Sequence, residues 1–100
     1  MRTMMRVHMD TRAGNEAAHS GALAKGMDAL MDEIHPEASY FFLDGGRRSA
    51  MFVFDLADPS RLPIIAEPLF GVMNAEIEFT PVMSLEDLQK GLSQLTTTAP

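Results

Sequence analysis

Two segments of the chain alternate apolar and polar residues, the pattern of a strand with one buried face. The first runs from Met4 to Thr11, and its two faces are formed by Met5, Val7 and Met9 and by Met4, Arg6, His8 and Asp10. The second runs from Ala75 to Met83, with Ile77 and Phe79 facing inward and Glu76, Glu78 and Thr80 facing outward. We therefore predict a first and a last strand that are each half buried.

Two apolar runs in the middle of the chain predict a hairpin. Residues 40–43 and 50–54 are rich in aromatic and β-branched residues, and Asp44-Gly45-Gly46 follows the first run with glycines suited to positive φ. Both runs are apolar on both faces, whereas an antiparallel strand exposed to water on one side should alternate. We infer that both faces of these two strands are covered.

An amphipathic helix is predicted between the first two strands. Gly14 and Asn15 indicate a turn, and the apolar stripe then consists of Leu23, Met27, Leu30, Met31 and Ile34. His35, which precedes a proline, is expected to end and cap this helix. Gly21 and Gly26 weaken the helix, so either it breaks before Ala22, leaving residues 15–20 as a mobile entrance segment, or it continues with two weak points.

Two more helices are predicted in the second half. Asp58-Pro59 is typical of a helix start, and an apolar stripe continues to Met73, with a kink or break expected near residues 64–67 because of Pro68. Ser84 is expected to cap a closing helix whose stripe consists of Leu85, Leu88, Leu92 and Leu95. Residues 96–100 are expected to fray.

The resulting order is βαββαβ plus one extra helix, which is the ferredoxin-like arrangement within the α+β class. We predict one domain over residues 1–100, with an antiparallel sheet and the helices on one face. We expect the first and third strands to run parallel at the centre of the sheet, and the fourth antiparallel beside the first. Since the helices cover one face only, a second copy of the chain is the simplest cover for the other, which predicts a homodimer.

Composition narrows the function classes. With no cysteine, the chain has no disulfide, thiolate metal site or cysteine nucleophile. A net charge of −6 and eight scattered basic residues argue against nucleic acid binding. The N-terminus lacks the apolar core of a secretory signal, and no apolar run is long enough to span a bilayer, so we expect a soluble cytoplasmic protein with no membrane partner. Nine methionines would suit either ordinary core filling or an adaptable apolar pocket.

Several short phrases add a family resemblance. They are Met9-Asp10-Thr11 with Gly14-Asn15, Pro36-Glu37-Ala38-Ser39-Tyr40-Phe41-Phe42, Ala57-Asp58-Pro59-Ser60, Ala66-Glu67-Pro68-Leu69-Phe70 and Thr80-Pro81-Val82-Met83. In these sequence segments the chain resembles a group of uncharacterised bacterial proteins, common in actinobacteria. This resemblance implies a fold but no activity. Its layout is similar to the dimeric α+β barrel superfamily, which includes antibiotic-biosynthesis monooxygenase-like, muconolactone isomerase-like and small polyketide cyclase proteins.

The candidate chemistry lies where the first and last strands would pair. Arg6, His8 and Asp10 would then share a face with Glu76, Glu78 and Thr80. A histidine flanked by carboxylates suits proton transfer beside a carbonyl group. The alternative is that Arg6 and His8 pair with the glutamates across the strands and stabilise the sheet. This group of side chains contains only one histidine, which is too few for a typical catalytic zinc site, so we predict no metal and no cofactor.

Two function classes remain open. The first is a homodimeric protein that binds a small apolar or aromatic molecule. The second is a cofactor-independent isomerase, cyclase or monooxygenase acting on an aromatic or polyketide-like substrate. The catalytic candidates are His8 as acid and base, Asp10 as its orienting carboxylate and Tyr40 as a hydrogen-bond donor. The ligand-binding candidates are Arg6, Met9, Phe42, Phe52, Phe54 and Glu78.

Overall fold

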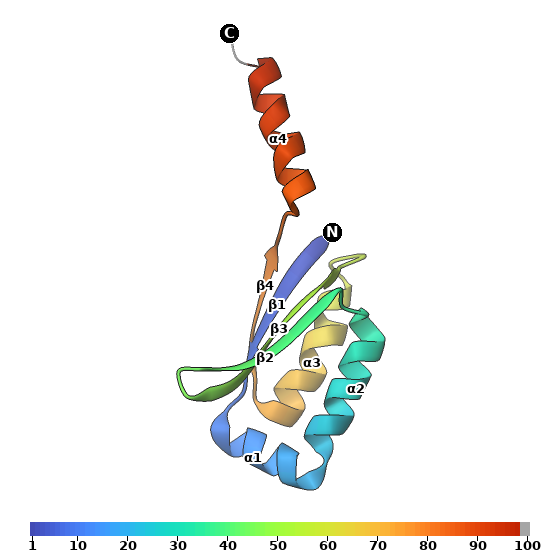
Figure 1. The fold of residues 1–100 in the computed structure, drawn as a ribbon. Coiled ribbons are helices and arrows are strands. Elements are labelled where there is room, and N and C mark those ends of the chain that lie inside the picture. The colour runs from blue at the N-terminus through green and yellow to red at the C-terminus, as the bar shows by residue number, and fades with distance from the viewer. Residues whose placement is uncertain (99–100) are drawn as a thin grey trace.

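The computed structural model of the chain describes residues 1–98 as an α+β fold with an open antiparallel sheet (Figure 1). Its elements are β1 (Arg2–His8), α1 (Thr11–Ser20), α2 (Ala22–Ile34), β2 (Ala38–Asp44), β3 (Arg47–Asp55), α3 (Arg61–Met73), β4 (Glu76–Pro81) and α4 (Leu85–Thr98). This architecture is compatible with a ferredoxin-like fold. Fraying was predicted for residues 96–100, of which residues 99–100 lie outside the described part.

The sheet has the strand order β2-β3-β1-β4, and every neighbouring pair is antiparallel. The expectation that the first and third strands run parallel is therefore wrong. The helical crossover returns the chain so that β2 runs in the same direction as β1. The tight turn at Gly45 and Gly46, with φ values of 61° and 77°, then reverses β3. The last strand lies antiparallel beside the first, as predicted.

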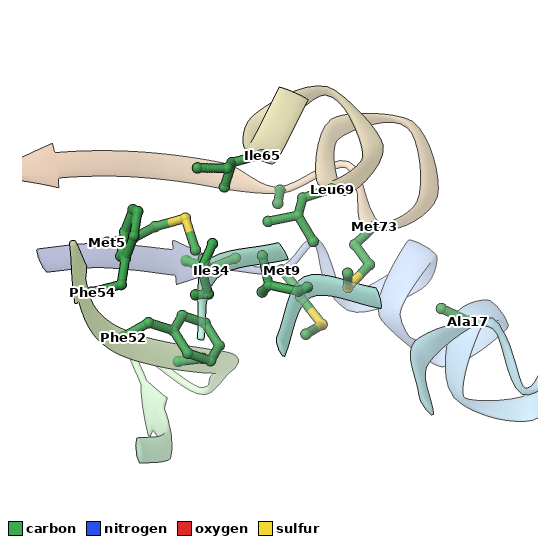
Figure 2. Packing of buried hydrophobic residues seen from close by; sticks show 13 residues of the cluster. Met5, Met9, Ala17, Ile34, Phe52, Phe54, Ile65, Leu69 and Met73 are labelled. Carbon is green, nitrogen blue, oxygen red and sulfur yellow. The ribbon is translucent and has the colours of Figure 1, made fainter. Parts of the chain in front are cut away.

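The core lies between one face of the sheet and the helices (Figure 2). The sheet contributes the inward side chains of β1 and β3, and α2 and α3 contribute most of the opposing layer. The largest fully buried side chains are Phe52, Phe54, Met5, Met73 and Val7. Each burial of this kind stabilises the fold by roughly 1.5–3 kcal/mol before the entropy cost of ordering the chain. The alternation of β1 and β4 is confirmed, because Ile77 and Phe79 of β4 also pack against this core.

The first helical region is broken at Gly21, which adopts a left-handed φ of 84° between α1 and α2. Of the two alternatives, the break is therefore the correct one. The preceding segment is not a loop, however, because Gly14 and Asn15 lie inside α1. The Asp10 carboxylate starts this helix by accepting a hydrogen bond from the Ala13 amide at 3.0 Å.

The helix α3 is continuous from Arg61 to Met73, so the break predicted near residues 64–67 is not present. Proline at position 68 removes one backbone hydrogen bond, which frees the carbonyl of Ile64 four residues earlier. The helix continues through this position, and Ile64 is on its exposed side at 50% exposure. The helix also begins later than Asp58, whose carboxylate instead accepts a hydrogen bond from the Ser60 amide at 2.9 Å.

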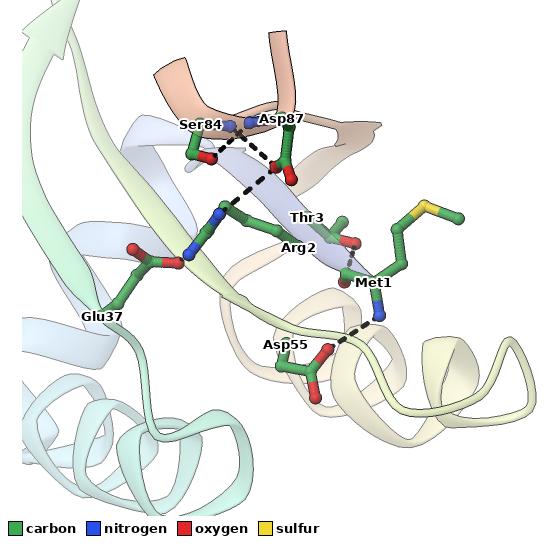
Figure 3. A network of polar contacts seen from close by, with 7 residues as sticks. All are labelled: Met1, Arg2, Thr3, Glu37, Asp55, Ser84 and Asp87. Atoms are coloured by element: carbon green, nitrogen blue, oxygen red, sulfur yellow. Dashed lines mark hydrogen bonds and ion pairs between the residues drawn. The ribbon is translucent and has the colours of Figure 1, made fainter. Parts of the chain in front are cut away.

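The closing helix α4 projects away from the sheet and the other three helices (Figure 1). Its start is fixed by a reciprocal cap, confirmed as predicted at Ser84. The Ser84 amide donates to Asp87 at 3.0 Å, and the Asp87 amide donates to the Ser84 hydroxyl at 3.1 Å. Arg2 joins this cap to the sheet, since its guanidinium lies 2.5 Å from Glu37 and 3.5 Å from Asp87 (Figure 3).

Candidate functional site

The face of the sheet opposite the helices has an apolar half and a polar half. Strand register places Tyr40, Phe42, Met51 and Val53 on this open face over β2 and β3, and Arg6, His8, Glu78 and Thr80 over β1 and β4. Tyr40 is 63% exposed, and Phe42 is half-buried. In one chain, therefore, aromatic and charged side chains meet along the β1–β3 boundary.

His8 lies at that boundary with only 9% of its side chain exposed. Its Nδ1 is 2.9 Å from the Ser49 hydroxyl oxygen, and that hydroxyl donates its one hydrogen to the Arg47 carbonyl at 3.0 Å. With the hydroxyl hydrogen on the Arg47 carbonyl, the Ser49 oxygen accepts from His8, and this arrangement goes with the tautomer that carries its hydrogen on Nδ1. Nε2 is left as the basic nitrogen of the neutral ring.

Asp44 provides the carboxylate that faces His8. Its Oδ2 lies 3.7 Å from His8 Nε2 and 3.6 Å from Arg6 Nη2. The Arg6 guanidinium also lies over the Phe42 ring, 5.8 Å from its centroid. Asp44 was not among the candidates, because its position before two glycines suggests only a turn. The same turn brings it to the end of β2 near His8.

The structure does not bring the three catalytic candidates together. The Asp10 carboxylate caps α1, as described above, and the acid that lies beside His8 is Asp44. Tyr40 is on the same open face, but its Cα position is two strands and two residues from that of His8, about 12 Å at ordinary strand spacing. The two side chains could face one molecule bound between them, but they do not form a contiguous catalytic group.

The ligand-binding candidates divide between two faces. Arg6, Phe42 and Glu78 are on the open face, where Glu78 is the register partner of Arg6. Phe52 and Phe54 face the helices and are 0% and 2% exposed, so they belong to the core. Burial decided this assignment, which alternation alone left open.

The expected ion pairs of Arg6 and His8 with the glutamates of β4 are replaced by pairs with residues of the β2–β3 hairpin. Within residues 1–98, the ion pair of Arg6 is made with Asp44, and Glu76 pairs with Arg47 at 3.2 Å. Both pairs are partly exposed, so each contributes at most about 1 kcal/mol to stability. The polar half of the open face is thus linked to the β2–β3 turn rather than across β1 and β4.

Met9 lines a separate apolar groove of about 380 Å³ beside the β2–β3 hairpin. The groove lies between this hairpin and α2, and its lining comprises Met9, Leu23, Met27, Phe41, Phe42, Leu43, Arg48 and Ser49. Phe41 and Leu43 remain 62% and 76% exposed there. We call this the hairpin groove. A smaller groove of about 190 Å³ lies between α2 and α3 and includes Ile64.

The described residues contain no group of three or more histidine, aspartate or glutamate side chains placed to hold a metal ion. None of the helices in this part of the chain is both long and apolar enough to cross a membrane.

Comparison with protein-family models gives no match, and comparison with curated proteins gives none either. The chemistry that the site supports is proton transfer at His8 Nε2, beside the carboxylate of Asp44 and the cation of Arg6.

Proposed function

We propose that this protein is a homodimer of the dimeric α+β barrel type that binds a small apolar or aromatic molecule against its open sheet face. The observation that supports the proposal most directly is the uncovered apolar half of that face, where Tyr40 is exposed and the other side chains are partly exposed. Tyr40, Phe42, Met51 and Val53 form it, and none of the four helices in the described chain covers it. An aromatic molecule would stack on these side chains while the polar half fixes its orientation.

The resemblance to a dimeric superfamily supports the same proposal, because packing two such faces removes their apolar surface from water. In the ligand complex, Arg6 would contact the polar end of the molecule. Its guanidinium is already positioned over Phe42 by the ring and by Asp44. A planar ligand with one carbonyl or carboxylate group fits this arrangement best.

The test is native mass spectrometry of the purified protein, followed by a matched pair of variants. Phe42→Asp puts a charge on the open face, and Phe70→Asp puts one on the exposed side of α3, where Phe70 is 44% exposed. We expect the wild-type protein to be a dimer that retains an apolar small molecule. The Phe42→Asp variant should lose both the dimer and the molecule, and the Phe70→Asp variant should keep both. A monomeric wild-type protein, or a Phe42→Asp variant that remains dimeric, would contradict the proposal.

A second candidate function is supported by the hydrogen bonding of His8. It is a cofactor-independent isomerase, cyclase or monooxygenase for an aromatic or polyketide-like substrate. For the isomerase form, His8 Nε2 takes a proton from the carbon next to a carbonyl, Arg6 stabilises the enolate oxygen, and the proton returns to another carbon. Asp44 would stabilise the imidazolium between these steps, and Tyr40 would donate a hydrogen bond to a distal oxygen.

His8→Ala tests this second candidate. We expect it to abolish turnover of a carbonyl substrate identified by the mass spectrometry, with the dimer retained. The melting temperature should fall, because His8 is only 7% exposed and its hydrogen bond to Ser49 is lost. The matched control is Glu67→Gln, at an exposed position of α3 away from the open face, which should retain turnover. Equal activity in His8→Ala and the wild-type protein would exclude the enzyme reading while leaving the binding proposal intact.

A further inference from the structure

The hairpin groove contains a guanidinium group that has no acidic partner in its own chain. The strands of the sheet carry four arginines, which are Arg2, Arg6, Arg47 and Arg48. The first three form ion pairs, with Glu37, Asp44 and Glu76 respectively. Arg48 is partly buried, yet within residues 1–98 its side chain makes no ion pair and no hydrogen bond. Since a partly buried charge without a partner costs free energy, an anion from outside the chain would stabilise this site.

Gly14 of α1 determines where this guanidinium lies. A methyl group at position 14 would lie 3.0 Å from Arg48 Nη1 and 3.6 Å from Arg48 Cδ, so the glycine leaves the space that the arginine side chain occupies. The Arg48 carbonyl also accepts a hydrogen bond from the Met9 amide at 2.9 Å, which joins β3 to the segment between β1 and α1. Contacts with Gly14 and Met9 therefore hold the positive charge at the end of the groove next to the β2–β3 turn.

The rest of the groove is apolar. On its sheet side, Leu43 is the register partner of Arg48, and Phe41 lies two residues farther from the turn. On its helix side, Leu23 and Met27 are about one turn apart on α2. One cation at the end of a groove with apolar walls is an arrangement that suits a ligand with a charged head and an apolar chain.

We propose that the hairpin groove binds a medium-chain fatty acid, with its carboxylate on Arg48 and its alkyl chain between α2 and the hairpin. A planar guanidinium can donate two parallel hydrogen bonds to one carboxylate. The alkyl chain would cover Phe41 and Leu43, which are 62% and 76% exposed in the chain by itself. Removing these side chains from water would add to the affinity supplied by the charge.

The size and the charge of the groove limit the ligand. A volume of about 380 Å³ holds about twelve non-hydrogen atoms at roughly 30 Å³ each, which corresponds to a carboxylic acid of about eight to ten carbons. One positive charge in a chain of net charge −6 favours a monoanion over a phosphate dianion. An unbranched alkyl chain also suits the flexible side chains of Met9 and Met27, which can adjust to its shape.

This site is separate from the one proposed above. The register of β2 and β3 places Phe41, Leu43 and Arg48 on the helix side of the sheet, opposite Tyr40 and Met51. A second copy of the chain packed on the open face would therefore leave the hairpin groove accessible. The inference does not depend on the proposed homodimer.

The test is isothermal titration calorimetry of the full-length chain with octanoate as the probe. Arg48→Gln removes the charge from the groove. The matched control is Arg47→Gln, which changes the neighbouring arginine on the opposite face of β3, where it pairs with Glu76. We expect Arg48→Gln to raise the dissociation constant roughly tenfold or more, and Arg47→Gln to change it by about twofold at most. Octanol, which has no charge, should bind the wild-type protein and Arg48→Gln equally.

A second pair of variants leaves Arg48 in place. Leu43→Asp gives the guanidinium an acidic partner on the neighbouring strand, and Leu43→Asn has nearly the same shape without the charge. Leu43 is 76% exposed, so both substitutions should preserve the fold. Leu43→Asp should bind octanoate roughly tenfold more weakly than Leu43→Asn does, because the new carboxylate competes with the ligand for Arg48.

NMR of the methionine methyl groups locates the ligand. Octanoate should shift the methyl signals of Met9 and Met27, which line the groove, and leave that of Met51 on the open face unchanged. A shift of Met51 alone would overturn the inference and place the ligand on the open face.

Three other results would also overturn the inference. They are no octanoate binding at millimolar concentrations, equal affinity in Arg48→Gln and the wild-type protein, and a dimer that dissociates when octanoate is added, which would mean that a second copy occupies the groove. Weaker binding in Arg48→Gln together with the shifts of Met9 and Met27 would support it. A wild-type protein that is monomeric and gives that result would contradict only the proposed homodimer.

Discussion

Replacing Phe52 with alanine should remove a large part of the stability of the fold. Phe52 is 0% exposed in the middle of β3, and its ring packs edge-on against Phe41 with centroids 5.8 Å apart and planes at 81°. Phenylalanine-to-alanine changes at such sites cost about 3–5 kcal/mol, which includes the lost transfer energy and the cavity left behind. A 100-residue domain has only about 5–15 kcal/mol to lose.

Urea denaturation followed by far-UV circular dichroism measures this loss. With a slope near 2 kcal/mol per molar, the midpoint should fall by about 2 M, and the melting temperature should fall by roughly 15–30 °C. Phe70→Ala at the same protein concentration is the control, because Phe70 is 44% exposed and should lose about 1 kcal/mol or less. A loss below about 1 kcal/mol in Phe52→Ala would refute the assignment of Phe52 to the core.

Three further changes test local features. Asp10→Ala removes the α1 cap and should lower the free energy of unfolding by about 1 kcal/mol in urea denaturation. In this variant nitrogen-15 NMR should still show the His8 hydrogen on Nδ1. A shift of that hydrogen to Nε2 would mean that Asp10 orients the ring. Gly46→Ala, at a φ of 77°, should cost about 1–2 kcal/mol and speed amide exchange first in the hairpin, and an unchanged exchange rate would contradict a strained turn. Hydrogen bonds from the Ser84 amide and hydroxyl lower the pKa of Asp87 below 3.8, so the cap stabilises α4 above that pH and is lost as the pH falls through the lower folded-state pKa. Amide exchange in α4 between pH 6 and 2 should show this loss, and a Ser84→Ala protein with the same pH profile as the wild type would exclude the cap as its cause.

Local sequence patterns determined most of the elements. Period-two alternation located β1 and β4 and told their inner faces from their outer ones, since side chains in a strand must point to opposite sides. Glycine pairs and caps located the hairpin turn and the start of α4, because positive φ and unpaired helix amides are satisfied by few residue types. The pattern also predicted that Arg6 and His8 share a face with Glu76 and Glu78, which the strand register confirms, whereas the ion pairs of Arg6 and Glu76 are made with Asp44 and Arg47.

The tertiary structure alone decided which groups meet. Phe42 and Phe52 both lie in apolar runs, and only the position of the helices assigns one to the open face and the other to the core. Asp44 reaches His8 because the hairpin turn directs it there, which no spacing along the chain predicts. Asp10 is adjacent to β1 in sequence, yet the free amides of α1 take its carboxylate, since a hydrogen bond three residues away costs little chain entropy. Local rules therefore specified the elements, and contacts between distant residues specified the site.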